Sequence, residues 1–299
     1  MSALREGHEW DSRVLRDEPM SKHTSWRVGG PADLYFVPRN IEELTGFLSE
    51  LDEQTPITWV GLGSNMLVRD GGIRGAVVSL VGALGQIERI SETRVLVQAG
   101  VACAKIARMC ARWNLGPAEF FSGIPGTMGG ALTMNAGAFG GETWRQVARV
   151  QVIDRKGNLS WRSPDEYEVG YRSVKGPVDS EWFVAAELEF VPQAAAGEEK
   201  IRDLLTRRKQ TQPIGQPSCG SVFRNPQGDH AARLIEAAGL KGLRHGGAQV
   251  SDKHANFIIN TGEATAAEIE YLINHVRDTV EKRFGVRLQH EVRVVGEAA

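Results

Sequence analysis

Hydrophobic residues recur along this chain with two different periods, and these periods predict helices and strands in turn. Apolar residues three and four apart predict a helix after Asn40, with Asn40 and Glu43 as a capping box. The same spacing predicts a second helix from Ala102 to Trp113. A hairpin turn is expected at 155–158 and a polar loop at 167–173. Short apolar runs predict strands over 34–37, 57–60, 75–80, 94–98, 147–154, 159–162 and 182–190.

The last third of the chain repeats this alternation after an Ala- and Gly-rich linker at 192–197. Asp229 is the expected cap of one helix, while Thr265 and Glu268 form a capping box for another that Gly285 ends. The expected helices and strands cover 198–209, 231–238, 254–260, 265–285 and 286–295. The whole pattern predicts an α+β fold, with a two-lobed region ending near residue 192 and a smaller α+β domain after it.

Composition limits the class of protein. The chain has 299 residues, 41% hydrophobic and 24% charged, which is enough for two globular domains. A net charge of −2 gives no basic field for nucleic acid. No apolar run reaches the length of a membrane span, and the charged N-terminus does not resemble a secretory signal. We therefore expect a cytoplasmic protein without nucleic-acid or membrane partners, and with residues 1–21 as a partly ordered arm.

The cysteines and histidines indicate neither a disulfide framework nor a metal site. Cys103, Cys110 and Cys219 are odd in number and scattered, which favours free thiols in a reducing compartment. No paired His spacing or Cys cluster matches a metal site. Motifs for phosphoryl transfer from nucleotides and for α/β-hydrolases are also missing.

Two glycine-rich stretches carry the first signal of function. Five of the seventeen residues in 122–138 are glycine, and 61–65 (Gly-Leu-Gly-Ser-Asn) directly follows a predicted strand. Glycine allows backbone N–H groups to approach an anion closely. The longer stretch is therefore either a wall that holds a large phosphorylated cofactor or a tight structural crossover. Because no G-x-G-x-x-G opens a helix after 61–65, a Rossmann site is disfavoured.

Four polar residues are candidates for chemistry, and each has a plain structural interpretation as well. Ser221 is either a turn residue or a positioned hydroxyl that delivers a proton. Arg172 is either a surface residue or a group that stabilises negative charge. Glu291 is either part of a cross-strand ion pair or a carboxyl group in an active site. Lys209 either meets the dipole at its helix end or binds an anion.

Five motifs occur together in one order: 61–65, 122–138, Tyr171-Arg172, Gly220–Pro226 and His290–Arg293. In this combination the chain closely resembles the UDP-N-acetylenolpyruvoylglucosamine reductase family, flavoenzymes of peptidoglycan precursor synthesis. The likeness runs from about His23 to Gly296, and the short connection from Tyr171 to Trp182 resembles the family's shorter subtype. That subtype lacks an additional substrate-covering insertion.

The resemblance implies a two-lobed FAD-binding domain of the vanillyl-alcohol-oxidase type and a separate substrate-binding domain. The implied boundaries are an arm at 1–21, an FAD domain at 22–192 with lobes at about 22–81 and 82–192, and a substrate domain at 199–299. NADPH would reduce non-covalent FAD, and UDP-N-acetylglucosamine enolpyruvate would then become UDP-N-acetylmuramate. Such an enzyme would serve cell-wall biogenesis, cell shape and cell division, and we expect it to be a monomer.

Site residues follow by the same resemblance. Ser221 matches the general acid, and Arg172 and Glu291 match groups that polarise the enolpyruvyl carboxylate. Tyr171, Lys209, Asn225 and His254 align with substrate-contacting positions, although another branch has Gln at the last of these. The implied cofactor-binding residues are Gly61, Leu62, Gly63, Ser64, Asn65, Ser122, Gly123, Ile124, Pro125, Gly126, Thr127, Gly129, Gly130, Asn135, Ala136 and Gly137.

Two positions depart from the family pattern. Val174 stands where the family has Ser, and Cys219 stands where a small apolar residue is usual. An inert core residue is the simpler interpretation of Cys219, and an oxidisable thiol is the alternative.

Two other classes of protein are kept as alternatives. One is another FAD-dependent sugar or alcohol oxidoreductase of the same fold, and the other is a non-catalytic nucleotide-sugar binding module. Tethered flavin is not expected, because neither glycine-rich motif contains His or Cys.

Overall fold

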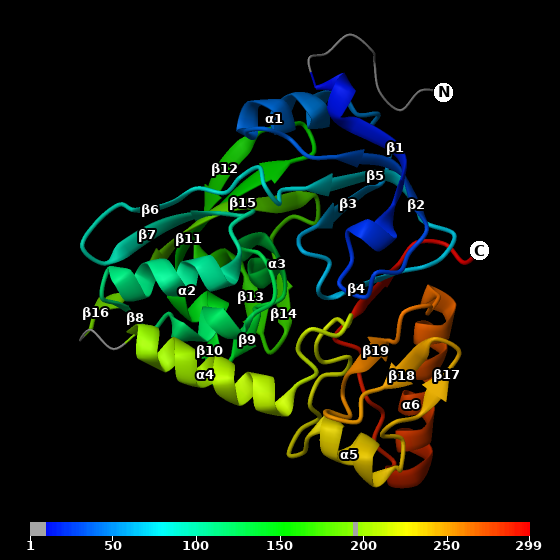
Figure 1. Ribbon diagram of the computed structural model, residues 1–299. Helices are drawn as coiled ribbons and strands as arrows, with labels where there is room; N and C mark the ends of the chain where they lie inside the picture. The colour runs from blue at the N-terminus through cyan, green and yellow to red at the C-terminus, as the bar shows by residue number, and fades with distance from the viewer. Residues whose placement is uncertain (1–9, 194–196) are drawn as a thin grey trace. The chain divides into compact units, whose positions relative to one another are not determined.

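The computed structural model describes residues 10–193 and 197–299, and Figure 1 shows its elements. The helices are α1 Ile41–Glu50, α2 Cys103–Arg112, α3 Met128–Thr133, α4 Gly197–Thr211, α5 Ala231–Ala237 and α6 Ala266–Phe284. The strands are β1 Val14–Pro19, β2 Pro31–Phe36, β3 Ile57–Val60, β4 Met66–Val68, β5 Ile73–Ser79, β6 Ile87–Arg89, β7 Arg94–Gln98, β8 Leu115–Gly116, β9 Gly137–Ala138, β10 Gly141–Glu142, β11 Val147–Asp154, β12 Leu159–Arg162, β13 Glu168–Gly170, β14 Ser173–Lys175, β15 Glu181–Glu189, β16 Val191–Pro192, β17 Arg244–His245, β18 Ala248–Val250, β19 Ile258–Asn260 and β20 Arg293–Val295.

The chain forms two compact units that are discontinuous in sequence. The first contains residues up to Leu15, then 35–61 and 75–207. The second contains 16–34, 62–74 and 208–299. Along the sequence, divisions between the units fall within β1, β2 and β5, which belong to a four-stranded sheet ordered β1-β2-β5-β3. The domain boundaries expected along the sequence remain a prediction. Part of the expected arm lies outside the described residues, and the linker at 192–197 is likewise described only at its ends.

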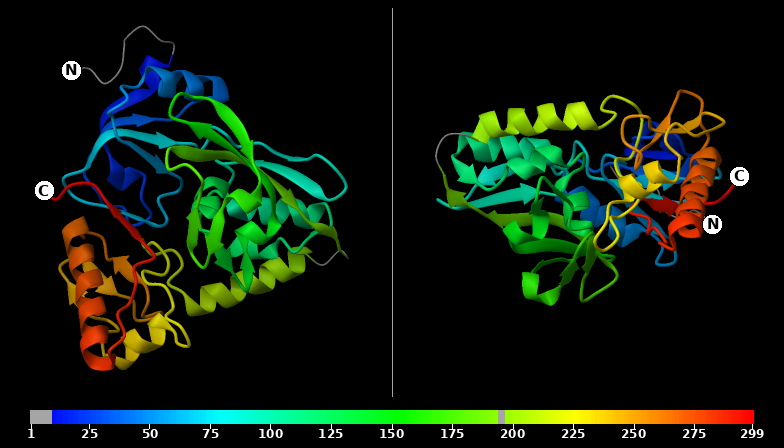
Figure 2. Two further views of the ribbon diagram at one scale, coloured as in Figure 1. Left: turned by 180° about the vertical axis from the view of Figure 1, so that it is seen from behind. Right: turned by 90° about the horizontal axis from the view of Figure 1, so that it is seen from below.

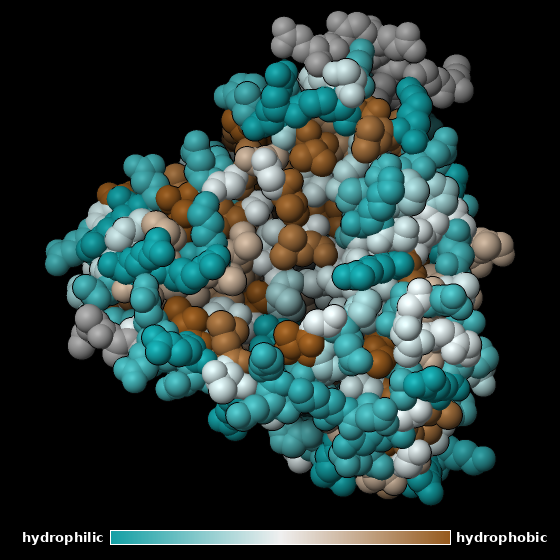
Figure 3. Space-filling model, in the orientation of Figure 1, coloured by the Kyte–Doolittle hydropathy of each residue, from teal (hydrophilic) through white to brown (hydrophobic). Residues whose placement is uncertain are grey.

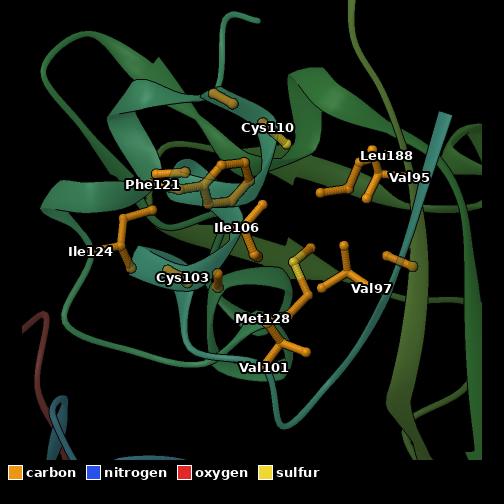
Figure 4. Close-up of a cluster of buried hydrophobic side chains, with 14 of the residues drawn as sticks. Val95, Val97, Val101, Cys103, Ile106, Cys110, Phe121, Ile124, Met128 and Leu188 are labelled. Atoms are coloured by element: carbon orange, nitrogen blue, oxygen red, sulfur yellow. The ribbon is translucent and has the colours of Figure 1, made fainter. Parts of the chain in front are cut away.

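A five-stranded sheet, β12-β11-β15-β7-β6, forms the centre of the first unit, and all its neighbouring strands are antiparallel. Helix α2 directs Cys103, Ile106 and Cys110 into a buried cluster with Val97 of β7 and Leu188 of β15 (Figure 4). Burial raises the pKa of both thiols to about 12, since the charged thiolate is poorly solvated there. These two cysteines are therefore core residues.

In the second unit, α6 packs against the sheet β17-β18-β19 (Figure 2). Thr265 and Glu268 form the predicted capping box, and Gly285 ends the helix with φ +69°. Strand β20 pairs in parallel with β4, so Arg293–Val295 lie beside Met66–Val68. Strand β4, which directly follows the glycine-rich motif 61–65, thus pairs with the C-terminal part of the chain.

Three predicted elements are wrong in ways that matter for the site. The expected loop at 167–173 is a hairpin of β13 and β14 with Tyr171 and Arg172 at its turn. The expected strand 286–295 is reduced to Arg293–Val295, and Glu291 lies before it. The expected strand 254–260 is reduced to Ile258–Asn260. In the last two, apolar residues such as Leu288 and Phe257 are buried outside any extended ladder.

Two predicted caps also differ. Asn40 accepts the N–H of Glu43 as predicted, but the Glu43 carboxylate accepts the N–H of Arg39 and does not complete the box. Asp229 does not cap α5; it pairs with Arg233, while the Asn225 side-chain oxygen accepts the first N–H of the helix at 3.1 Å.

The surface and the helices give further limits. Hydrophilic residues dominate the face shown in Figure 3, with hydrophobic residues in separate groups. Within residues 10–193 and 197–299, no helix is long and apolar enough to span a bilayer. The same residues contain no group of three His, Cys, Asp or Glu side chains that could hold a metal ion.

Candidate active site

The glycine-rich stretch 122–138 is a helical turn followed by a short helix. Ser122 is buried and its hydroxyl donates to the Glu119 carbonyl at 2.6 Å. Ile124 and Met128 point into the core of the first unit (Figure 4). Thr127 caps α3 by accepting the N–H of Gly130. The stretch is therefore a buried wall as expected, but it contains a helix that the sequence did not predict because Gly129 and Gly130 disfavour one.

Glycine is required where this wall meets its neighbours. A Cβ on Gly61 would lie 2.7 Å from Thr127 Oγ1, so the end of β3 and the start of α3 touch through glycine. A Cβ on Gly129 would lie 3.1 Å from the Ala99 Cβ. Gly130 differs, because it is exposed and the nearest atom to a Cβ there would be 3.8 Å away. A close approach of backbone to a ligand is thus open at Gly130, which fits a cofactor cradle.

Arg172 is held by the glycine-rich stretch itself. Its guanidinium donates to the carbonyls of Gly137 at 2.8 Å and Asn135 at 3.3 Å. Asn135 is buried, and its side-chain N–H donates to the Gly170 carbonyl at 3.2 Å while its oxygen accepts the N–H of Trp144. The first unit therefore brings a predicted catalytic cation onto the predicted cofactor wall. In this structure Asn135 anchors the hairpin that carries Arg172.

Glu291 is tied to two other predicted site segments in the second unit. Its backbone N–H donates to the Val222 carbonyl at 2.8 Å, one residue after Ser221. Its carbonyl accepts from the Asn65 side chain at 3.0 Å, and the Arg293 N–H donates to the Asn65 carbonyl at 3.1 Å. The second unit thus joins the end of the 61–65 motif, the segment of Ser221 and the segment of Glu291.

Cys219 reinforces this junction. Its thiol donates to the carbonyls of Gly63 and Met66, both at 3.4 Å. Burial raises the pKa of this thiol to about 12, so the reactive thiolate is suppressed. This favours the inert interpretation of Cys219. Val174, the other departure, packs against the core of the first unit.

The predicted substrate residues lie in different settings. Lys209 is exposed on α4, and its carbonyl accepts from Lys253 Nζ at 2.6 Å. His254 is half-buried, and its Nδ1 accepts the N–H of Asn256 at 3.3 Å. Burial lowers the pKa of His254, so the neutral ring with its proton on Nε2 is favoured. Tyr171 is exposed, with its ring 5.1 Å from the Arg172 Cζ.

Comparison with known protein families first defines the class of protein. A family model described as "FAD binding domain" matches residues 32–162. A second, described as "UDP-N-acetylenolpyruvoylglucosamine reductase, C-terminal domain", matches residues 212–295. These matches define a flavoprotein.

Full-length relatives then give the family. A UDP-N-acetylenolpyruvoylglucosamine reductase from Alkalilimnicola ehrlichii is 58% identical over 94% of this chain and 94% of the relative. One from Methylococcus capsulatus is 59% identical over 95% of this chain and 93% of the relative. A crystal structure of the enzyme from Thermus caldophilus has 31% identity and a TM-score of 0.82, covering 94% of this chain and 98% of the other. The chain belongs to the UDP-N-acetylenolpyruvoylglucosamine reductase family.

This membership confirms the predicted family, the α+β fold with its FAD-binding and C-terminal domains, and the identification as an FAD-dependent oxidoreductase. The individual residue roles are not tested by these likenesses and stay predictions. Sequence reasoning missed Asn256, which contacts the Ser221 segment, because a lone asparagine in an apolar run carries no signal of its own.

Gly130→Ala is expected to weaken FAD binding while leaving the fold intact. Alanine stabilises a helix by about 0.5–1 kcal/mol relative to glycine, so the melting temperature of the apoprotein should stay level or rise. A methyl group facing the cofactor should raise the Kd for FAD about tenfold or more, equivalent to about 1.4 kcal/mol. Fluorescence titration of FAD measures this, with Gly129→Ala as the variant that instead strains packing against Ala99. An unchanged Kd would remove Gly130 from the cofactor site.

Proposed function

We propose that this chain uses NADPH to reduce UDP-N-acetylglucosamine enolpyruvate to UDP-N-acetylmuramate. The observation that carries the proposal is the junction in the second unit. There Asn65 of a cofactor motif, the segment after Ser221 and the backbone of Glu291 are joined by direct hydrogen bonds. Family membership supplies the substrate class, and the junction links the three kinds of residue that such a reaction needs.

Bound FAD would supply the two-electron chemistry that carries a hydride from NADPH to the vinyl methylene carbon of the substrate. Residues 61–65, 122–127, 129–130 and 135–137 would hold it, with the exposed backbone at Gly130 allowing close approach. No cysteine or histidine lies in either segment, so we propose a non-covalent complex. The described cysteines are free, which accords with a cytoplasmic reaction.

Ser221 would deliver the proton that completes the reduction. Addition of hydride to the vinyl methylene carbon leaves an enolate. The adjacent carbon, which bears the carboxylate, then takes a proton from Ser221 Oγ, and solvent reprotonates the serine. A serine hydroxyl is a weak acid, but an enolate is a strong base, so a hydroxyl held within hydrogen-bonding reach can donate. One proton and one hydride are thus added across the double bond, and NADPH becomes NADP⁺.

Arg172 and Glu291 would stabilise the charge that develops on the enolpyruvyl carboxylate. Removal of one such fixed donor costs about 3–4 kcal/mol of transition-state stabilisation in precedent. Carbonyls of Asn135 and Gly137 already hold the Arg172 guanidinium, so little reorganisation is needed during the reaction. Tyr171, Lys209, Asn225 and His254 would contact the UDP-sugar.

The flavin spectrum tests the proposal directly. The purified protein should be yellow, and denaturation followed by filtration should release the colour. NADPH should bleach the absorbance of the bound flavin, and UDP-N-acetylglucosamine enolpyruvate should restore it under anaerobic conditions with formation of UDP-N-acetylmuramate. Restoration by a simple sugar or alcohol instead would indicate another oxidoreductase of this fold. A colourless protein that binds UDP-sugars would indicate a binding module.

A further inference from the structure

All the polar groups of Asn256, in its backbone and its side chain, form hydrogen bonds with residues of the candidate site. Its side-chain oxygen accepts the N–H of Phe223 at 3.0 Å, and its side-chain nitrogen donates to the Phe223 carbonyl at 2.8 Å. Its backbone carbonyl accepts the N–H of Val222 at 2.9 Å. Its own N–H donates to His254 Nδ1 at 3.3 Å. One residue therefore holds both peptides that follow Ser221, together with the imidazole of His254.

Residues 222–224 also form hydrogen bonds with residues 289–291, the segment that contains Glu291. The Val222 carbonyl accepts the N–H of Glu291 at 2.8 Å, and the Arg224 N–H donates to the Gln289 carbonyl at 2.9 Å. Phe223 and His290 form an isolated antiparallel bridge. Residues 222–224 thus lie between Asn256 and 289–291, and the position of Asn256 fixes this segment relative to Glu291.

Ser221 depends on this backbone for its placement. Among residues 10–193 and 197–299, its hydroxyl has no hydrogen-bond partner. Gly220 precedes it with φ +69°, a conformation that lets the chain turn sharply just before the serine. On the C-terminal side, the constraint on Ser221 comes from the hydrogen-bonded Val222 and Phe223 peptides.

We propose that Asn256 is a positioning residue that fixes the position and orientation of the Ser221 hydroxyl relative to Glu291. This inference rests on the proposed function, in which Ser221 protonates the enolate. An asparagine side chain suits the task, because it presents one acceptor and one donor to the two polar groups of a single residue. Asn256 is only 3% exposed, so water cannot readily replace those hydrogen bonds.

Asn256→Asp and Asn256→Leu test the inference at two levels. Aspartate keeps an acceptor for the Phe223 N–H and loses the donor to its carbonyl, whereas leucine loses both. A displacement of about 1 Å can slow a reaction by about a hundredfold, so the rate at which enolpyruvyl substrate reoxidises the reduced flavin should fall about 10–100-fold. Reduction by NADPH and the Kd for substrate should change less than about threefold, because neither requires the proton from Ser221.

Two readouts separate positioning from a general loss of structure. The solvent deuterium isotope effect on reoxidation should increase, since proton delivery becomes slower than the other steps. Exchange of the Phe223 amide hydrogen, followed by NMR, should accelerate in Asn256→Leu, which removes the acceptor of that N–H, and less in Asn256→Asp, which keeps it. Asn260→Leu is the matched control: Asn260 is also buried in this region, but its side chain contacts Trp26, Gly262 and Ala264. It should lower the melting temperature without changing the isotope effect.

The outcomes are distinguishable. If the wild-type flavin is not reoxidised by the enolpyruvyl substrate, the proposed function fails. If wild type is reoxidised and both Asn256 variants match its rate and isotope effect, only the positioning inference fails. If both variants fail to fold, exchange in the wild type still decides, because an unprotected Phe223 amide would overturn the inference.

Discussion

Ser221→Ala is expected to abolish turnover while leaving the reduction of bound flavin by NADPH close to wild type. Alanine removes the hydroxyl and little else, and that hydroxyl makes no hydrogen bond to other described residues, so the fold should be retained. General acid catalysis contributes about 10²–10⁴-fold, and reoxidation of the flavin by enolpyruvyl substrate should slow by that amount. Anaerobic stopped-flow absorbance measures the two half-reactions separately.

Ser218→Ala provides the control for this variant. Ser218 lies three residues earlier in the same loop, and its hydroxyl donates to the Gln216 carbonyl at 3.3 Å. It should leave both half-reactions unchanged. A Ser221→Ala protein that reoxidises at the wild-type rate would remove Ser221 from the mechanism, whatever its NADPH reaction shows.

Gly63→Ala is expected to have the largest effect on structure and on flavin content. Gly63 has φ +58°, and a Cβ there would lie 2.1 Å from the His23 carbonyl oxygen and 2.6 Å from the Thr24 Cα. Both are backbone atoms, so no side chain can rotate away. The left-handed conformation alone costs an alanine about 1–2 kcal/mol. With the overlap, we expect a loss of about 4 kcal/mol or more in the free energy of unfolding.

Gly82→Ala separates the two contributions. Gly82 has φ +80° but nothing within 4 Å of a Cβ, so only the conformational cost applies there. Denaturant unfolding and the ratio of flavin to protein absorbance should therefore show a small loss for Gly82→Ala and a large one for Gly63→Ala. A Gly63→Ala protein with normal stability and full flavin content would contradict the account of residues 61–65.

Local signals predicted some elements of this fold well. Thr265, Glu268 and Gly285 mark the two ends of α6, because caps depend on a few nearby residues. The strand 286–295 was overpredicted, since its alternation reflects burial of Leu288 and Val292 in the core without an extended ladder. Tertiary contacts decide such cases, and they are not visible in the periodicity.

Some residues of the candidate site could likewise be predicted from the sequence, and others could not. The glycines of 61–65 and 122–138 stood out because the chemistry of close approach demands them. The hairpin turn at Arg172 did not stand out in the sequence. Arg172 has a φ of +54°, a conformation for which such turns usually have Gly, Asn or Asp. Asn256 could not be found from its neighbours either, since its meaning depends on Phe223, which lies elsewhere in the sequence.

The parallel pairing of β20 with β4 has a consequence for synthesis of the chain. Arg293–Val295 are translated long after Met66–Val68, yet the two segments are strand partners. Strand β4 must therefore wait for its partner until β20 has been translated, whereas the five-stranded sheet of the first unit is complete once β15 has been translated. Closure of so long a loop is entropically unfavourable until the contacts around it form. If residues 62–65 contribute to flavin binding, as we propose, a nascent chain that has not yet reached β20 lacks the strand partner of the segment that follows them, and it captures flavin only once β20 has been made.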